Sequence, residues 1–367
     1  MTSEMSDIKQ SLKAAYARRD LHFSFEARTS RGSMTDKETY LLRLVAPDDD
    51  PSDPRAPGAV GECAIFRGLS ADDSPLYEQR LKALCRAINR GEPFDISEWS
   101  SLRFGLECAL ISVDRGFSQV LFPTAFTQGK QQLPINGLVW MDSVENMSRQ
   151  VREKIARGFT TVKFKIGAHD FESEMKMLDQ LRMTYGPDQI TIRLDANGAF
   201  SPDDALEKLK RLSALDIHSI EQPIKAGQWD RMAYLCENSP LPIALDEELI
   251  GVTSRDMKRK MLYYIAPQYI VLKPSLCGGL SGASEWAETA DQFKIGWWPT
   301  SALESSVGLD AIAQWTAATQ PGVCSGLGTG QLYTNNFESP LSVDNGHLSR
   351  DPNKRIELDG LQWIVPE

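Results

Sequence analysis

The stretch TVKFKIG, from Thr161 to Gly167, indicates the fold of the larger part of this chain. Its apolar and polar side chains alternate and a glycine follows, which is typical of a β-strand. Lys163 and Lys165 stand two residues apart, and successive side chains of a strand point to opposite faces. We therefore expect both lysines to face the interior of a sheet and Phe164 to face the helices around it.

This strand belongs to a series of short apolar strands that alternate with amphipathic segments. The expected strands are Ile135–Met141, Thr161–Ile166, Thr191–Asp195, Ser219–Gln222, Ile243–Leu245, Tyr269–Leu272 and Gly296–Pro299. The helical segments between them include Ser143–Arg157, Phe171–Tyr185, Ser201–Leu215 and Ser281–Phe293. Parallel neighbours need a crossover, usually a helix, and seven repeats favour a closed barrel over an open sheet. We expect Leu327–Tyr333 to supply one last short strand.

The N-terminal part of the chain has a different pattern, with strands first and helices afterwards. The expected strands are His22–Ala27, Thr39–Val45 and Gly61–Ile65, and the expected helices are Pro75–Asn89 and Ser101–Asp114. A Gly/Ser loop is expected over Ser30–Lys37. The acidic, Pro-rich stretch Pro47–Pro57 reads as a solvated insertion. This order is typical of a small α+β unit.

Composition excludes several classes of protein. The net charge of −10 comes without a basic block, which argues against a nucleic-acid partner. The polar N-terminus lacks the apolar core of a signal peptide, and no run approaches the roughly 20 apolar residues that span a bilayer, so we expect a cytoplasmic protein without a membrane partner. The six cysteines form no CxxC pair, and nearly all of them are expected to be buried thiols in a reducing compartment. With four histidines, metal chemistry must depend on carboxylates.

Charged residues stand at or near the C-terminal ends of five successive expected strands. They lie 25 to 30 residues apart along the chain, one for each strand–helix repeat, and are Lys165 with Lys163, Asp195, Glu221, Asp246 and Lys273. One charge at a strand end is most often a solvated loop residue or a helix cap. Five in register point to the rim of a barrel, where barrel enzymes place their reacting groups.

Three carboxylates between lysines suggest a metal-assisted reaction on a small-molecule carboxylate. Mg²⁺ prefers carboxylate oxygens and keeps positions open for water or substrate. A carboxylate on the metal can lose its α-proton to a lysine because the metal stabilises the enediolate. The lysine must be neutral, so burial and nearby positive charge must lower its pKa from about 10.4. Lys163 supplies that like charge beside Lys165.

In this order these residues resemble the enolase superfamily, within it the muconate-lactonizing subgroup. The matching pieces are KFK, RLDANGAF, IEQP, ALDEE and VLKPSLCGGL. The resemblance implies an α/β fold, a modified TIM barrel of (β/α)7β type, with an α+β capping domain formed mainly by the N-terminal region. It implies a capping domain over residues 1–130, the barrel over 131–335, and a C-terminal segment over 336–367 that returns to the capping domain.

Within this subgroup the chain is most similar to the o-succinylbenzoate synthase family of menaquinone biosynthesis. The similarity rests on SLRFGLECAL (101–110), PINGLVWM (134–141), VLKPSLCGGL (271–280) and TSALESSVGLDAIA (300–313). It implies that Lys165 removes the α-proton and protonates the departing hydroxyl in a syn dehydration. Lys273, on the opposite face, would stabilise the enediolate. The implied ligands of Mg²⁺, with Mn²⁺ as a substitute, are Asp195, Glu221 and Asp246.

The resemblance also implies supporting roles near the reacting groups. Lys163 would support Lys165, and Asn197 would lie just behind the metal ligands. Arg193 shares the strand face of Asp195, so we expect it in the barrel interior one layer down, near the substrate. Ser301 is the expected contact for the succinyl carboxylate. A flap over Arg28–Thr35 would close over the substrate.

Several alternatives stay open at this stage. An N-acylamino acid racemase or a dipeptide epimerase would use the same lysines and carboxylates. A barrel lysine can instead form a Schiff base, which borohydride would trap. A non-catalytic binding protein would have lost at least one of the charged residues. Glu248 shares the strand face of Asp246 and could replace it as a ligand. The sequence is compatible with a monomer or a homodimer.

Overall fold

The computed structural model of the protein describes residues 12–29, 32–140, 142–167 and 169–367. Its central element is a seven-stranded sheet in the order β5-β6-β7-β8-β9-β10-β11. All neighbouring pairs in this sheet are parallel. The strands are β5 (Gly137–Val139), β6 (Thr161–Lys165), β7 (Thr191–Asp195), β8 (Ser219–Glu221), β9 (Ile243–Leu245), β10 (Tyr269–Leu272) and β11 (Gly296–Pro299). The predicted series of strands is confirmed. β5 is shorter than expected, and Met141 lies outside the described residues.

The sheet closes through two residues rather than through the expected last strand. Ser325 bridges to Ile135 and Gly326 bridges to Thr300, both in parallel orientation. The predicted strand over Leu327–Tyr333 is wrong, because the chain there forms turns. A Cβ on Gly326 would lie 2.6 Å from Oγ1 of Thr300, so the closing residue has to be a glycine. The sheet is thus a barrel with a very short eighth element.

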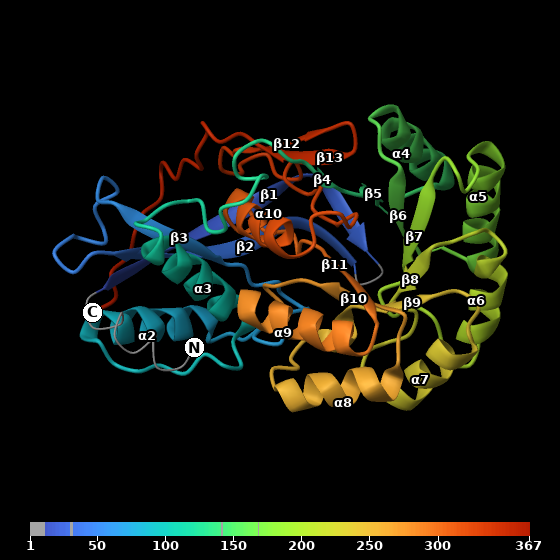
Figure 1. The fold of residues 1–367 in the computed structure, drawn as a ribbon, viewed down its shortest axis with the longest axis horizontal. Helices are drawn as coiled ribbons and strands as arrows, with labels where there is room; N and C mark the ends of the chain where they lie inside the picture. Colours follow the sequence, from blue (N-terminus) through green and yellow to red (C-terminus); the bar gives the residue numbers. More distant parts are fainter. Residues whose placement is uncertain (1–11, 30–31, 141, 168) are drawn as a thin grey trace.

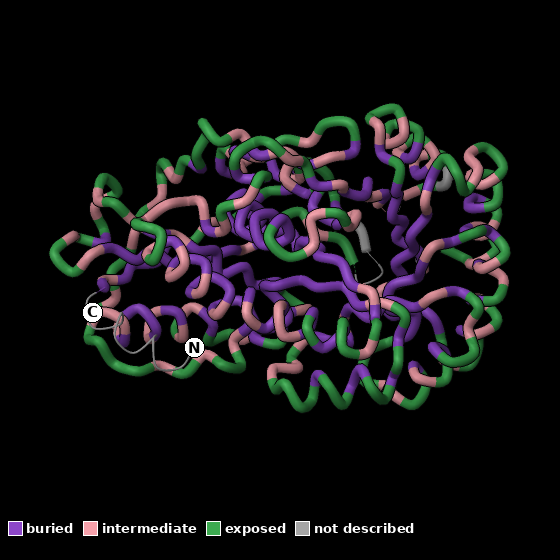
Figure 2. The backbone as a smooth tube through the Cα atoms, in the orientation of Figure 1, coloured by how far each residue is buried: buried purple, intermediate pink, exposed green. Residues whose placement is uncertain are grey.

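Helices cover the outside of this barrel (Figure 1). They are α4 (Val144–Ala156), α5 (Phe171–Thr184), α6 (Ala205–Ser213), α7 (Trp229–Asn238), α8 (Arg255–Ile265), α9 (Gly279–Gln292) and α10 (Ser306–Thr319). Hydroxyl or carboxylate caps accept a backbone N–H at the starts of α4, α5, α8 and α10, as is usual for helix N-termini. α6 begins four residues later than predicted. Figure 2 shows the buried residues concentrated on the strands and on the inner faces of these helices.

The predicted alternation of β6 is confirmed. Phe164 is fully buried and belongs to the main hydrophobic core between strands and helices. Lys163 and Lys165 point the other way and line a pocket inside the barrel mouth. The pleat of one strand therefore separates a residue that packs the fold from residues that carry charge into the site.

The N-terminal domain is a three-stranded antiparallel sheet with two helices. Its elements are β1 (Lys13–Thr29), β2 (Gly32–Val45), β3 (Gly58–Cys63), α2 (Tyr77–Arg90) and α3 (Ser100–Asp114). β1 and β2 are much longer than predicted, and the loop expected over Ser30–Lys37 is wrong from Gly32 onward. Pairing continues through Ala27 with Met34 to Thr29 with Gly32, because backbone hydrogen bonds do not require apolar side chains.

Two further segments complete the fold. The Pro47–Pro57 stretch is a mostly exposed loop, and Arg43 donates to the carbonyl oxygens of Pro51 and Ala56 inside it. Near the C-terminus, β13 (His347–Arg350) pairs on one side with β12 (Leu341–Asp344) and on the other with β4 (Leu133–Pro134), both antiparallel. Ile364 then pairs with Tyr16 of β1. The division into residues 1–130, 131–335 and 336–367 drawn from the sequence stays a prediction.

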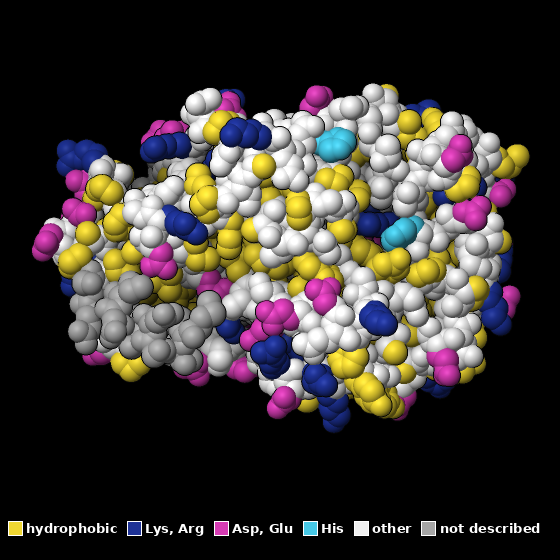
Figure 3. All heavy atoms as spheres, viewed as in Figure 1, with side chains coloured by type: hydrophobic (Ala, Val, Ile, Leu, Met, Phe, Trp, Pro, Cys, Tyr) yellow, Lys and Arg dark blue, Asp and Glu magenta, His cyan; other side chains and the backbone are white. Residues whose placement is uncertain are grey.

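The surface and the cysteines agree with the composition. Five of the six cysteines are buried free thiols, and Cys324 is half-buried, as predicted. Within the described part of the chain, no helix has the length and apolar character to cross a membrane. Figure 3 shows acidic and basic side chains interspersed on one face rather than gathered by sign.

Candidate active site

Three carboxylates meet at the C-terminal ends of β7, β8 and β9. Asp195, Glu221 and Asp246 are almost completely buried, and one oxygen of each lies within 4.8 Å of the others. Parallel pairing sets this arrangement, since Asp195 stands opposite Glu221 in the sheet and Asp246 follows the adjacent strand. The sequence spacing of one strand–helix unit thus becomes a separation of a few ångströms.

The chemistry of this cluster fits a hard divalent cation. Three buried carboxylates repel one another, and burial is the main cause that raises the pKa of Glu221 to about 7. Oε1 of Glu221 is buried and has no hydrogen-bond partner within the described residues. A cation bound by oxygen ligands would use this acceptor and remove the repulsion. These residues could therefore hold a metal ion.

The structure distinguishes between the two acidic residues that share a strand face after β9. Asp246 joins the carboxylate cluster. Glu248 turns away, where its carboxylate accepts from Nε2 of Gln222 at 3.0 Å and from the backbone N–H of Gly227 at 2.7 Å. Glu248 stabilises a loop and contributes no oxygen to the cluster.

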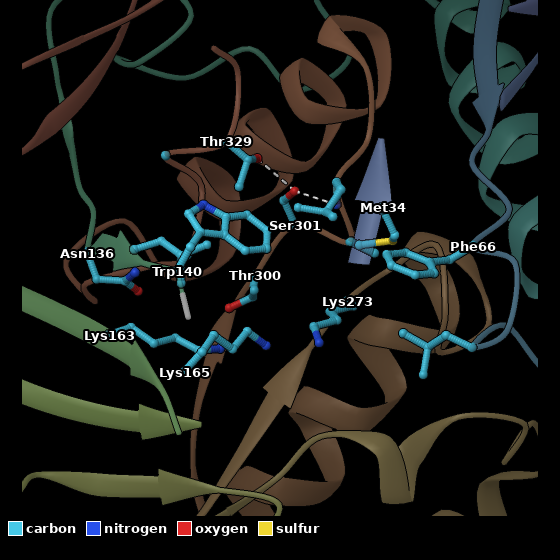
Figure 4. Close-up of a pocket in the computed structure, with 16 residues that line it drawn as sticks. Met34, Phe66, Asn136, Trp140, Lys163, Lys165, Lys273, Thr300, Ser301 and Thr329 are labelled. Carbon is cyan, nitrogen blue, oxygen red and sulfur yellow. Dashed lines mark hydrogen bonds between the residues drawn. The ribbon is translucent and has the colours of Figure 1, made fainter. Parts of the chain in front are cut away.

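Three lysines surround the carboxylates and separate them from the pocket. Nζ of Lys165 donates to Asp195 at 2.6 Å, and Nζ of Lys163 lies 2.8 Å from the same oxygen and also contacts Glu221. Lys273 pairs with Asp246 from the opposite side. In Figure 4, Lys165 and Lys273 extend toward one another. The reacting carbon of a substrate would fit between these two amines.

The lysines differ in their tendency to lose a proton. Burial lowers the pKa of Lys165, and the charges of Lys163 and Lys273 lower it further against the opposing effect of Asp195. For Lys163 burial also acts downward, but Asp195 and Glu221 outweigh it and raise the pKa. Lys163 is thus a fixed cation, and Lys165 is the one of these two lysines whose surroundings favour the neutral amine, the form that a general base requires.

Two predicted residues lie beside the charged cluster rather than in the pocket wall. Oδ1 of Asn197 accepts from Nζ of Lys165 at 2.8 Å, and Nδ2 donates to Glu247 at 2.9 Å. Arg193 lies one layer below Asp195, and its guanidinium carbon Cζ lies 4.1 Å from the centre of the Trp298 ring. Its Nη1 donates to the carbonyl oxygen of Cys324. Asn197 therefore orients Lys165, while Arg193 packs the barrel floor.

A pocket of about 700 Å³, partly open to solvent, lies above the lysines. One wall is polar, where Oγ1 of Thr329 donates to Oγ of Ser301 at 2.8 Å (Figure 4). The same Ser301 oxygen accepts from the backbone N–H of Leu303 at 2.9 Å, so its own proton remains for a ligand. The remaining walls are largely apolar and include Met34, Phe66, Leu69, Leu138, Trp140, Ala302 and Leu303.

The capping domain contributes to this pocket through residues that the sequence did not single out by role. Of the predicted flap Arg28–Thr35, Met34 lines the pocket, and residues 30 and 31 lie outside the described residues. Phe66 and Leu69 follow β3, and no pattern in the sequence marked them. Asn136 and Trp140 lie in PINGLVWM, a motif noted only for its resemblance, which was the available signal.

Comparison with known proteins extends these observations. The model of the enolase C-terminal domain-like family matches residues 146–354. An o-succinylbenzoate synthase of Desulfotalea psychrophila is 44% identical over 92% of this chain and 98% of its own length. The crystal structure of MenC from Desulfotalea psychrophila LSv54 is 41% identical, covers 93% of this chain and 100% of that one, and gives a TM-score of 0.82. An N-succinyl-L-Arg/Lys racemase of Bacillus cereus is 31% identical over 49% of this chain and 48% of its own length.

Proposed function

The chain belongs to the enolase C-terminal domain-like family, and from this membership we propose that it is an o-succinylbenzoate synthase, a carbon–oxygen lyase. The observation that carries the proposal is the 44% identity to a synthase along nearly the whole of both chains. The substrate is 2-succinyl-6-hydroxy-2,4-cyclohexadiene-1-carboxylate, and the product is o-succinylbenzoate of menaquinone biosynthesis.

Lys165 performs both proton transfers in this reaction. As a neutral amine it removes the proton α to the ring carboxylate, and the electron pair moves into that carboxylate as an enediolate. The enediolate then expels the ring hydroxyl, and Lys165 returns its proton to that group, which leaves as water. The lysine is regenerated and the ring becomes aromatic. Asn197, 2.8 Å from Nζ, holds the amine in position.

Asp195, Glu221 and Asp246 would hold Mg²⁺, with Mn²⁺ as a substitute. When bound, the ion stabilises the negative charge that develops on the substrate carboxylate. Lys273 faces Lys165 across the pocket and offers a second positive charge to the same oxygens. Lys163 stays protonated between Asp195 and Glu221 and lowers the pKa of Lys165.

The pocket has groups suited to the rest of the substrate. The free hydroxyl proton of Ser301 points to a contact with the succinyl carboxylate, and Thr329 fixes that hydroxyl. Met34, Phe66 and Leu69 give the ring an apolar cover, which keeps water from the enediolate. Arg193 supports the barrel floor and keeps positive charge near Glu221.

An N-acylamino acid racemase or dipeptide epimerase remains the alternative. Two lysines on opposite sides of one carbon also suit removal and return of a proton on opposite faces. The 31% identity to a racemase over half of the chain supports this second activity.

One assay separates the two activities. The purified protein with Mg²⁺ is given the cyclohexadiene precursor, and o-succinylbenzoate is followed by its absorbance, with N-succinylamino acids tested in parallel by polarimetry. We expect fast dehydration that EDTA abolishes and that Mg²⁺ or Mn²⁺ restores. Racemisation without dehydration would reject the synthase in favour of the alternative.

The remaining expectations concern the setting of the enzyme. Its partner is a small-molecule carboxylate, and neither a nucleic acid nor a membrane takes part in the reaction. We place the enzyme in the cytoplasm as a monomer or a homodimer. Size-exclusion chromatography with light scattering measures the oligomeric state directly.

A further inference from the structure

A buried acidic cluster connects the capping domain to the polar wall of the pocket. It consists of two carboxylates, Glu62 on β3 and Glu304 after β11, and one amine, Lys37 on β2. Burial lowers the pKa of Lys37, and the charges of both carboxylates act against this larger effect. All three side chains are buried, and Nζ of Lys37 has no hydrogen-bond partner within the described residues. The mechanism proposed above uses none of them. Such a charged cluster in an interface needs a physical reason, because burying charge is costly.

Glu62 binds both domains with one carboxylate. Oε1 accepts from Oγ1 of Thr39 on β2 at 2.8 Å and from the backbone N–H of Ser305 at 2.9 Å. Oε2 accepts from Oγ of Ser305 at 2.6 Å and from the backbone N–H of Gly308 at 2.8 Å. A residue of the capping domain thus caps the N-terminus of α10, a helix of the barrel.

Glu304 continues this connection into the pocket wall. It accepts from the backbone N–H of Ala302 at 2.8 Å and from Oγ of Ser275, two residues after Lys273, at 2.5 Å. Leu303, which lies between Ala302 and Glu304, has φ of 62°. This is a left-handed conformation that a leucine keeps only when its neighbours hold it. The hydroxyl of Tyr333 donates to the carbonyl oxygen of Leu303 at 2.7 Å and adds to this hold.

We propose that Glu62 is a positioning residue, through which the capping domain sets the loop that carries Ser301 and so determines binding of the distal part of the substrate. The proposal deepens the function above and rests on it for the identity of the substrate. Met34 and Lys37 lie three residues apart on β2, so the strand that covers the pocket is also the strand tied to Glu62. Within the described residues, no hydrogen bond joins Glu62 to Lys165 or to the carboxylate triad, which lie on or directly after β6 to β9.

The test is Glu62→Gln, with Glu107→Gln as its matched control. Each oxygen of Glu62 accepts from a backbone N–H, one from Ser305 and the other from Gly308. In Glu62→Gln an NH₂ group replaces one of these oxygens, so a donor must face a backbone donor. Glu107 on α3 is also a carboxylate of the capping domain that bonds to a helix of the barrel. It accepts from the backbone N–H of Ser281 in α9 at 3.0 Å. In the part of the chain that the structure describes, no hydrogen bond or ion pair joins Glu107 to residues 300–305. Thr39→Val, which removes only the hydroxyl donor, is the milder variant if Glu62→Gln does not fold.

We expect Glu62→Gln to raise KM about tenfold with kcat within about twofold, and Thr39→Val to raise KM about threefold. Hydrogen exchange over residues 300–309 should become faster in both variants and should stay unchanged in Glu107→Gln. An unchanged KM and unchanged exchange in Glu62→Gln would overturn the proposal, and so would an equal rise of KM in Glu107→Gln. If the wild type does not dehydrate the precursor, the proposed function fails, and the exchange measurement still decides whether Glu62 holds the loop.

Discussion

Two adjacent residues of β6 should fail in opposite ways when they are replaced. Phe164 is fully buried in the main core, and a buried Phe→Ala change costs about 3–5 kcal/mol in the free energy of unfolding. That is a large part of the roughly 5–15 kcal/mol that domains have. We therefore expect Phe164→Ala to lower the urea midpoint strongly while the folded fraction keeps kcat within a few-fold of the wild type.

Lys165→Met should show the reverse. The variant keeps most of the aliphatic stem and loses the ammonium bond to Asp195 at 2.6 Å, but Asp195 keeps Lys163 at 2.8 Å. The loss is offset by the burial cost of the ammonium, so we expect a stability change within about 1 kcal/mol. Turnover should fall by roughly 10²–10⁴, the usual contribution of general acid–base catalysis, with product binding retained.

The assays are urea unfolding followed by tryptophan fluorescence, steady-state dehydration, and calorimetric titration with o-succinylbenzoate. Phe164→Leu serves as the control, with a smaller loss of stability and full turnover. If Lys165→Met lowered the urea midpoint as much as Phe164→Ala does, Lys165 would be a packing residue like Phe164. If Lys165→Met kept more than about a tenth of the wild-type turnover, Lys165 would not be the base.

Three further predictions test other parts of the structure. Asp246→Asn should weaken Mg²⁺ binding at least tenfold in calorimetry, while Glu248→Gln, whose carboxylate faces Gln222 and Gly227, should leave metal affinity nearly unchanged; equal losses would contradict the assignment. Burial and then Arg193 lower the pKa of His218 to about 4. Between pH 6.5 and 4 the unfolded chain therefore binds a proton at His218 that the folded chain does not. The stability contributed by the neutral His218 is present above pH 6.5 and is lost as the pH falls toward 4. The effect should be about 1–2 kcal/mol after allowance for solvent, and it should disappear in His218→Phe when urea midpoints are compared at pH 7 and 4.5. Ala266, the C-cap of α8, has φ of 47°, so Ala266→Gly should raise the unfolding free energy by roughly 0.5–1 kcal/mol, and a loss of stability would show that the αL position carries no strain.

The sequence predicted the barrel because its evidence is local and repeated. Each strand is a short apolar run between turn residues, and each is followed by an amphipathic helix, so most strand limits were within one or two residues of the structure. The predictions failed where pairing does not depend on side-chain character. β2 starts at Gly32 inside a Gly/Ser stretch, and the barrel closes at Ser325 and Gly326, because backbone hydrogen bonds made both.

The same distinction holds at the site. Lys163, Lys165, Asp195, Glu221, Asp246 and Lys273 could be named from their regular spacing, since a parallel barrel brings equivalent strand ends to one rim. Asp246 was also the sequence's choice of ligand, with Glu248 left open as a replacement. The structure puts Asp246 in the carboxylate cluster and turns Glu248 away, because the short 3₁₀ turn η2 (Glu247–Leu249) after β9 breaks the alternation on which strand parity depends.

The fold class, the charged rim and the side-chain directions on β6 could all be read from the sequence. The first two follow from the strand–helix repeat and its spacing of 25 to 30 residues, and the third from the alternation along one strand. The pocket cover was predicted only in part, as the flap over Arg28–Thr35 that contains Met34. The remaining contacts appeared only in the tertiary structure: Phe66 and Leu69 also reach the pocket from the capping domain, and Glu62 ties that domain to α10 across more than 240 residues of chain. No local pattern encodes such contacts, because they depend on how the N-terminal sheet and its helices pack against the barrel.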